Sequence, residues 1–133
     1  MNATLTYLDD SLAILGFAYS PEDAESGNPY NCSFSLRIVS GEFSGLAPCE
    51  YDIKAFRQFV LELEELYQFK RNTVELSDIC CGSKVVFSID KTGHITVNGN
   101  TYGEGLAHSL EFEFLVDQTV LPTFLRELHL LIR

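Results

Sequence analysis

The sequence predicts an α+β fold, a meandering antiparallel β-sheet of about eight strands with two α-helices packed on one face. Three observations support this prediction. Several segments alternate apolar and polar residues with the period of two expected of a half-buried strand. Two segments, about 52–69 and 118–132, instead carry apolar residues at three- and four-residue steps, which is the spacing of one helix face. The strand segments are joined by connections too short for parallel neighbours, which need long crossovers.

The first part of the chain predicts four strands and an exposed loop. Residues 4–8 and 12–19 are apolar segments on either side of an Asp-Asp-Ser turn, and residues 33–38 alternate strictly. A further strand at 42–51 contains a glycine and a proline, which are typical of an edge strand or a bulge. Residues 20–31 hold two prolines, a glycine and three acidic residues, which predicts an exposed acidic loop.

The first helix, at about 52–69, has the strongest helical pattern in the sequence. Asp52 stands at its N-cap position, where a carboxylate can accept hydrogen bonds from the unpaired amides of the first turn. The residues of its apolar face are Ile53, Phe56, Phe59, Val60, Leu63, Leu66 and Tyr67. This face predicts a helix packed against the sheet.

Four more strands follow, and then the second helix. The strands are expected at about 73–79, 84–90, 94–101 and 106–116. Glycine-containing turns are expected at Asp90–Gly93 and at Asn98–Asn100. In the last strand, one face is expected to carry Leu106, His108, Leu110, Phe112, Phe114 and Val116. Pro122 falls in the first turns of the final helix, where a missing amide proton costs least.

The two predicted helices resemble each other. Residues 59–66 (FVLELEEL) and 124–131 (FLRELHLL) match at Phe, Glu, Leu and Leu. A strand meander precedes each helix. Two interpretations stay open: an internal duplication of a meander-plus-helix unit, or a chance match between two leucine-rich helices.

Length and composition indicate a single domain spanning residues 1–133. The chain is 46% hydrophobic with ten Phe and six Tyr, which suffices for a core without disulfides or metal. The net charge of −10 disfavours nucleic acid and anionic membranes, because phosphate contacts need Lys or Arg. No signal peptide or membrane-spanning run is recognisable, and the cysteine spacing resembles no secreted framework. We therefore expect a cytoplasmic protein whose four cysteines are free thiols.

No residue pattern predicts a catalytic, cofactor-binding or metal site. The three histidines have no metal-ligand spacing, and we expect Cys80 and Cys81 to point to opposite faces, so that they do not chelate one ion together. The segment 98–105 has several glycines but lacks the ending of a phosphate-binding loop. Glu111 and Glu113 share a strand face, and a solvated surface explains them better than glycoside hydrolysis.

The remaining signal is acidity. Acidic side chains grouped on one surface produce a negative field that speeds the approach of a basic protein partner. The sequence offers three groups for such a partner-binding surface. They are Asp9 and Asp10; Glu22, Asp23 and Glu25; and Glu111 and Glu113. A further acidic group, Glu62, Glu64 and Glu65, lies on the first helix and can add to the same field.

Several segments in order resemble one family. They are Gly-Glu-Phe-Ser-Gly at 41–45, Tyr-Asp at the start of the first helix, the hairpin Asp90–Val97, and Leu-Glu-Phe-Glu-Phe at 110–114 followed by Asp-Gln-Thr. Together they resemble the WapI-like immunity proteins, which are small cytoplasmic bacterial proteins encoded beside secreted polymorphic toxins. The resemblance implies a non-enzymatic protein that binds and neutralises a cognate toxin domain, commonly a nuclease. It supplies no catalytic residues and no cofactor.

Two other functions stay open at the level of sequence. The free face of the sheet could form a pocket, which would make the chain a small-molecule-binding or regulatory domain of unknown ligand. A small enzyme with an unfamiliar site is the third hypothesis. Homo-oligomerisation is also left open by the sequence.

Overall fold

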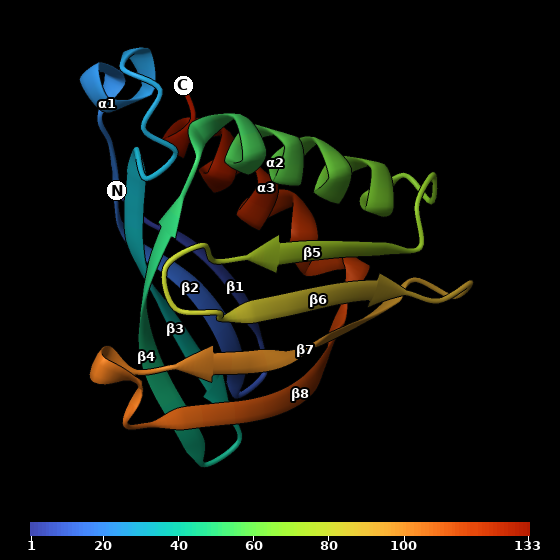
Figure 1. Cartoon of the computed structure of the whole chain (residues 1–133). Helices are drawn as coiled ribbons and strands as arrows, with labels where there is room; N and C mark the ends of the chain where they lie inside the picture. The colour runs from blue at the N-terminus through green and yellow to red at the C-terminus, as the bar shows by residue number, and fades with distance from the viewer.

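The computed structural model describes residues 1–133 and contains eight strands and three α-helices. The first sheet has the order β1-β2-β3-β4 and the second the order β5-β6-β7-β8, and every neighbouring pair is antiparallel (Figure 1). The strands of the first sheet are β1 Ala3–Tyr7, β2 Asp10–Tyr19, β3 Cys32–Ser40 and β4 Phe43–Tyr51. Those of the second sheet are β5 Thr73–Ser77, β6 Lys84–Ile89, β7 His94–Tyr102 and β8 Ser109–Asp117. The helices are α1 Pro21–Glu25, α2 Ile53–Tyr67 and α3 Leu121–Leu131.

The α+β class, the eight antiparallel strands and the two long helices are confirmed. The strands do not form one sheet, however, because the chain starts a second meander after α2. In each sheet the strands follow chain order, as expected when short connections join antiparallel neighbours. No helix is long and apolar enough to cross a membrane.

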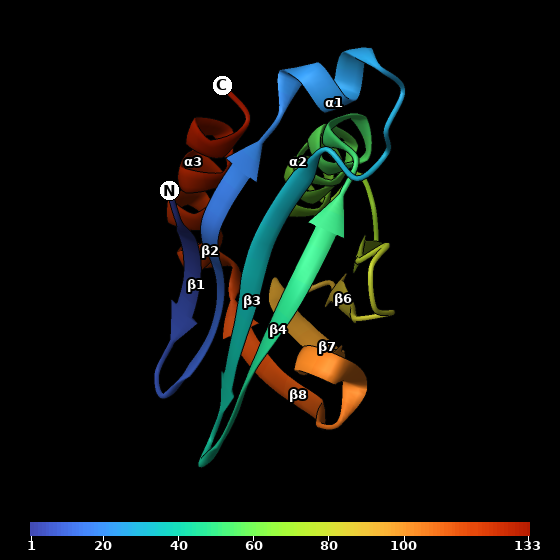
Figure 2. The ribbon, with the colours of Figure 1, turned by 60° about the vertical axis from the view of Figure 1, so that its left-hand side comes forward.

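The two helices are exchanged between the sheets. Helix α2 follows the first sheet in the chain but packs against β5 of the second, while α3 follows the second sheet and packs against β1 of the first. The helices also contact each other, at the end of the molecule away from β8 (Figures 1 and 2). Strand β8 contacts β1, β3 and β4, so the sheets meet there. Each meander therefore receives part of its core cover from the other unit's helix, while α2 also packs on its own meander, where Phe56 contacts the rings of Phe34 and Tyr51.

One hydrophobic cluster of 30 buried residues fills the space between the sheets and helices. Both sheets contribute their inward faces, so that Leu36 and Val97, for example, are almost fully buried. At α2 the residues expected on the apolar face are buried, except Tyr67 at its end. Asp52 caps the helix as expected, accepting a hydrogen bond from the Lys54 amide at 3.2 Å.

The matched helices occupy equivalent places in the two-part architecture. Phe59 and Phe124 are buried, as are the matched pairs Leu63 and Leu128, and Leu66 and Leu131. The matched positions Glu64 and His129 lie across the α2–α3 contact, with Oε1 and Nε2 2.6 Å apart. Equivalent residues that meet each other are typical of a two-fold arrangement. Of the two interpretations that the sequence left open, the structure fits the two-part repeat of a meander plus a helix.

Three local predictions differ from the structure. The acidic loop at 20–31 contains the short helix α1, which Ser20 caps by accepting a bond from the Asp23 amide at 3.3 Å. The turn expected at Asn98–Asn100 lies inside β7, where Gly99 is needed because a Cβ atom would collide with the Lys84 carbonyl of β6. The chain turns instead at 103–108, so β8 begins at Ser109 and His108 is exposed, not on the apolar face.

Candidate partner-binding surface

The acidic residues proposed from the sequence lie at two separated places. Glu22, Asp23 and Glu25 belong to α1, which follows the C-terminal end of β2. Asp9 and Asp10 lie at the opposite end of the same ten-residue strand, in the β1–β2 turn. Figure 2 shows α1 and this turn at opposite ends of the first sheet. The structure therefore does not unite all the predicted acids in one surface.

It does bring Asp9 and Asp10 to the same end as Glu111 and Glu113. Asp10 Oδ1 accepts a hydrogen bond of 2.8 Å from the Gly41 amide, which ties the β1–β2 turn to the β3–β4 turn. Ser40, the last residue of β3 before that second turn, donates from its Oγ to the Glu113 carbonyl at 3.5 Å. The β3–β4 turn thus lies between the two acidic groups.

An exposed phenylalanine lies in the same place. Phe43, the first residue of β4, is 72% exposed, although a phenyl ring favours burial. It borders a hollow of about 430 Å³ that is also lined by Ser40, Leu110 and Phe112 and by both glutamates of β8. A smaller hollow of about 220 Å³ continues from Phe43 and Leu110 along β4 to Leu46, which is 57% exposed.

We call this region the hairpin-tip surface. It consists of Asp9, Asp10, Glu42, Phe43, Leu46, Leu110, Glu111 and Glu113. Its acids have no ion-pair partner, because the five ion pairs of the molecule lie elsewhere. Residues 1–36 and 92–125 contain no Lys or Arg, and most of the surface is built from these two segments. The result is an apolar centre with an acidic rim that has no ion-pair partner, and Arg37, opposite Leu46 in the β3–β4 register, is the adjoining basic residue.

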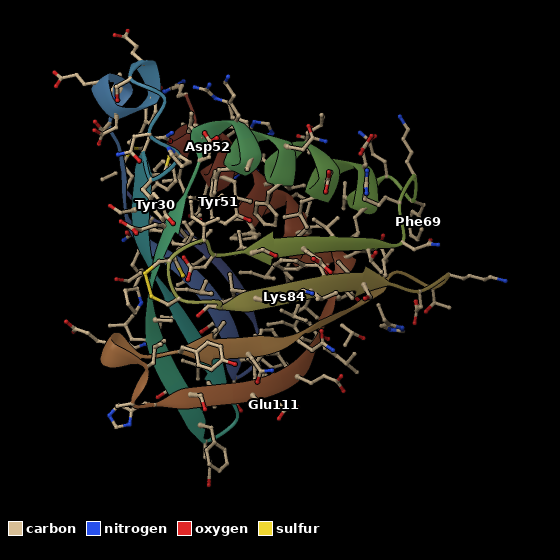
Figure 3. The ribbon with its side chains drawn as sticks, in the orientation of Figure 1. Tyr30, Tyr51, Asp52, Phe69, Lys84 and Glu111 are labelled. Atoms are coloured by element: carbon tan, nitrogen blue, oxygen red, sulfur yellow. A yellow bond between two sulfur atoms is a disulfide. The ribbon has the colours of Figure 1, made fainter.

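Strand β8 positions its two glutamates by simple alternation. Phe112 and Phe114 point inward and are buried, which leaves Glu111 and Glu113 exposed on the outer face. In the sheet register they stand opposite Asn100 and Asn98 of β7. Figure 3 shows Glu111 on the outer side of β8, with Lys84 on the same sheet two strands away. Lys84 itself pairs with Glu75 at 3.2 Å and does not neutralise the β8 carboxylates.

Sequence reasoning missed Glu42 and Phe43. The sequence predicts an edge or bulged strand over 42–51 and assigns neither residue to a binding surface. The sequence nonetheless carries a signal of exposure, because Phe43 directly follows a turn and stands between Gly41 and Gly45. Large apolar residues in a tight turn have few neighbours to bury them.

The histidines do not form a site. His94 and Asp90 lie in an exposed turn, where Thr92 Oγ1 is 2.8 Å from His94 Nδ1. Hydrogen bonds from Thr92 and from the His94 amide lower the pKa of the exposed Asp90 carboxyl. His129 pairs with Glu64 between the helices.

The cysteines fall into two pairs. Cys32 and Cys49 are free and buried. Burial and the nearby Asp52 carboxylate raise the pKa of Cys32 to about 11. Burial and the nearby Asp78 carboxylate raise the pKa of Cys49 to about 12. Cys80 and Cys81 are joined as a disulfide, so the expectation of four free thiols is wrong for this pair. They lie in the loop after β5, where strand alternation does not apply and both sulfur atoms can point the same way.

Comparison with known proteins gives one similar fold and one family. The solved structure described as crystal structures of Trypanosoma bruciei MRP1/MRP2 shares the fold with a TM-score of 0.53 at 9% identity. The alignment covers 99% of this chain and 82% of that one. No curated protein matches the sequence. The family model described as "Immunity protein WapI-like family" matches residues 10–133. The chain therefore belongs to the WapI-like immunity protein family, as its segments of resemblance suggested.

Proposed function

We propose that this chain is a non-enzymatic immunity protein that binds a cognate toxin domain in the cytoplasm and blocks its activity. The observation that carries the proposal is the match of the family model over residues 10–133. Neutralisation by binding needs a preformed surface and no catalytic group. The hairpin-tip surface has the character that such binding requires, because aromatic anchors inside a polar rim dominate protein interfaces.

Charge indicates the chemistry of the toxin. Its contact surface should be basic, because the chain carries a net charge of −10 and the hairpin-tip acids have no ion partner. A nuclease fits this requirement, since an enzyme that holds phosphates presents Lys and Arg at its site. The carboxylates would occupy the place of those phosphates, so that the complex excludes the nucleic acid.

The small-molecule alternative draws less support. The free face of the second sheet does carry a hollow of about 470 Å³, but its lining is polar apart from Phe112. Sites for small ligands are concave and mostly apolar. Native mass spectrometry of the purified chain tests this alternative, because a retained ligand would add a fixed mass.

The test of toxin neutralisation is co-expression with the toxin domain encoded beside this chain. We expect the chain to restore growth and to form a one-to-one complex with the toxin in size-exclusion chromatography. An unrelated acidic domain of similar size serves as the control for charge alone. Continued growth arrest in cells that contain the folded chain would refute the proposal.

A further inference from the structure

A second grouping of reactive side chains lies in the loop between β5 and β6, at residues 78–83. Ligand atoms of Asp78, Cys80 and Cys81 all lie within 4.8 Å of one another. This loop contacts Glu50 of β4, near the opposite end of that strand from Phe43. The disulfide appears in Figure 3 as the yellow bond beside β4.

Hydrogen bonds hold Asp78 in one position. Its Oδ1 accepts from the amides of Glu50 and Cys80 at 2.7 and 3.0 Å, and its Oδ2 accepts from the Cys81 amide at 2.8 Å. The Ile79 amide donates to the Glu50 carbonyl at 3.1 Å. Both the amide and the carbonyl of Glu50 therefore hold the loop against β4. A carboxylate has about four acceptor positions. Oδ2 therefore keeps one lone pair for a further ligand.

Neither cysteine of this loop is buried, since Cys80 is exposed and Cys81 is half-buried. Cys80 is exposed and borders an open hollow of about 450 Å³ over the outer face of the first sheet, beside Ser33, Ser35 and Glu50. Cys49 also borders this hollow, but it and Cys32 are buried, with exposures of 3% and 2%. Chemistry from solution can therefore reach the adjacent pair first.

We propose that the reduced loop is a binding site for one zinc ion, with Cys80 Sγ, Cys81 Sγ and one Asp78 carboxylate oxygen as its protein ligands. Two sulfur ligands and one oxygen ligand suit Zn²⁺, whereas Mg²⁺ and Ca²⁺ take oxygen alone and Cu⁺ favours sulfur alone. The fourth position faces the hollow, where water or a ligand from solution completes the tetrahedron. The site is separate from toxin binding and does not rest on the proposed function.

The disulfide must be reduced before the metal can bind. Two small thiols supply two electrons and two protons, which break the Cys80–Cys81 bond and leave two cysteine thiols and one small-molecule disulfide. The two cysteine thiols release their protons to solvent as Zn²⁺ binds the thiolates. Disulfide and zinc therefore exclude each other at this loop.

The test is a titration of the full chain with Co²⁺, which reports sulfur ligation by a thiolate-to-cobalt charge-transfer absorption. The chain reduced with a phosphine should bind one Co²⁺ and release it to one equivalent of Zn²⁺. The oxidised chain should show no absorption. The double variant C80S/C81S should lose the absorption, and D78N should bind at least about tenfold more weakly. The buried-cysteine variant C32A is the matched control and should bind like the wild type.

The outcome that overturns the proposal is a reduced, folded chain without stoichiometric Co²⁺ binding. Unchanged absorption in C80S/C81S would overturn it equally, because the sulfur ligands would then be elsewhere. If that variant does not fold, alkylation of Cys80 and Cys81 in the reduced native chain removes the same ligands. Circular dichroism before and after alkylation separates loss of the site from loss of the fold.

Discussion

At the scale of residues, exposure distinguishes side chains that build the fold from those available for a partner. Phe43 and Phe56 have the same side chain and opposite environments. Phe56 is fully buried on the inner face of α2, whereas Phe43 is 72% exposed at the β3–β4 turn. Burial of an exposed phenyl ring against a partner stabilises the complex by about 1.5–3 kcal/mol. The exposed ring is therefore a natural anchor.

Replacing Phe43 by alanine should weaken toxin binding by about 30-fold or more, because an interface anchor contributes about 2 kcal/mol. The Tm should stay unchanged, since the ring has few neighbours in the free protein. Phe69, 52% exposed at the end of α2, provides the matched control. Figure 3 shows it at a different end of the molecule from Glu111. Isothermal titration calorimetry should give F69A wild-type affinity; equal losses in both variants would argue against the hairpin-tip surface.

Exposure should also separate the thiols by reactivity, with Cys80 and Cys81 reacting faster than the buried Cys32 and Cys49. Burial raises the pKa of Cys32 to about 11 and that of Cys49 to about 12, so both remain protonated at pH 8 and react slowly. The reduced native chain should therefore gain two carbamidomethyl groups, at Cys80 and Cys81, and the denatured chain four. Intact mass spectrometry counts them. Rapid addition of four groups to the native chain would contradict the burial of Cys32 and Cys49.

At the scale of elements, α2 shows how one helix serves both sheets. It is joined to β4 through Asp52, and its buried face packs against β5 of the other meander. Asn31 reinforces the start of the helix, because its Oδ1 accepts from the Ile53 amide at 2.8 Å and its Nδ2 donates to Asp52 Oδ1 at 3.2 Å. The direction of α2 is thus fixed where it leaves the first sheet.

Two leucines on this helix allow a matched test of the packing. Leu63 is fully buried and Leu61 is 51% exposed. We expect L63A to lower the free energy of unfolding by about 2–5 kcal/mol, because it leaves a cavity in the core. L61A should change it by no more than about 0.5 kcal/mol. Urea denaturation measures both, and similar effects would mean that the helix faces a different way.

At the scale of the whole molecule, the exchanged helices make the two meanders interdependent. Without residues 70–133 the first sheet lacks the helix that covers β1, and without residues 1–69 the second lacks the helix that covers β5. We propose on this basis that residues 1–133 form a single cooperative domain. Each half expressed alone should be unfolded by circular dichroism, and the full chain should unfold in one transition. A folded half would show that the units are separate domains.

The net charge is a property of the whole molecule, because the electric field of all its charges steers an approaching partner. Two triple variants change the net charge equally: E42K/E111K/E113K alters the hairpin-tip surface and E22K/D23K/E25K alters α1. Each adds six charge units, which takes the net charge from −10 to −4. We expect the hairpin-tip variant to slow toxin association at low salt by about tenfold or more and to reduce its salt dependence. The α1 variant should have a smaller effect.

Stopped-flow measurements at several salt concentrations distinguish the outcomes. Equal slowing by both variants would mean that net charge alone acts, with no local contact. Greater slowing by the α1 variant would move the interface to Glu22, Asp23 and Glu25. Since both variants carry the same charge, differences between them report position.

Most of the elements could be predicted from the sequence, because their signals are local, whereas the short helix α1 and the start of β8 could not. Alternation placed the strands, the three- and four-residue steps placed α2 and α3, and Asp52 marked where the first helix begins. The order of apolar segments also indicated the family. These signals lie within about a dozen neighbouring residues, so one chain is enough to recognise them.

How those elements meet can be seen only in the folded chain. The division into two sheets, the exchange of helices and the approach of Asp10 to Gly41 all join segments far apart in the chain. Periodicity shows that a side chain faces a core, but it does not say which sheet or helix supplies that core. For the same reason the sequence could propose the acids of the turns and of β8, while only the folded chain placed Phe43 between them.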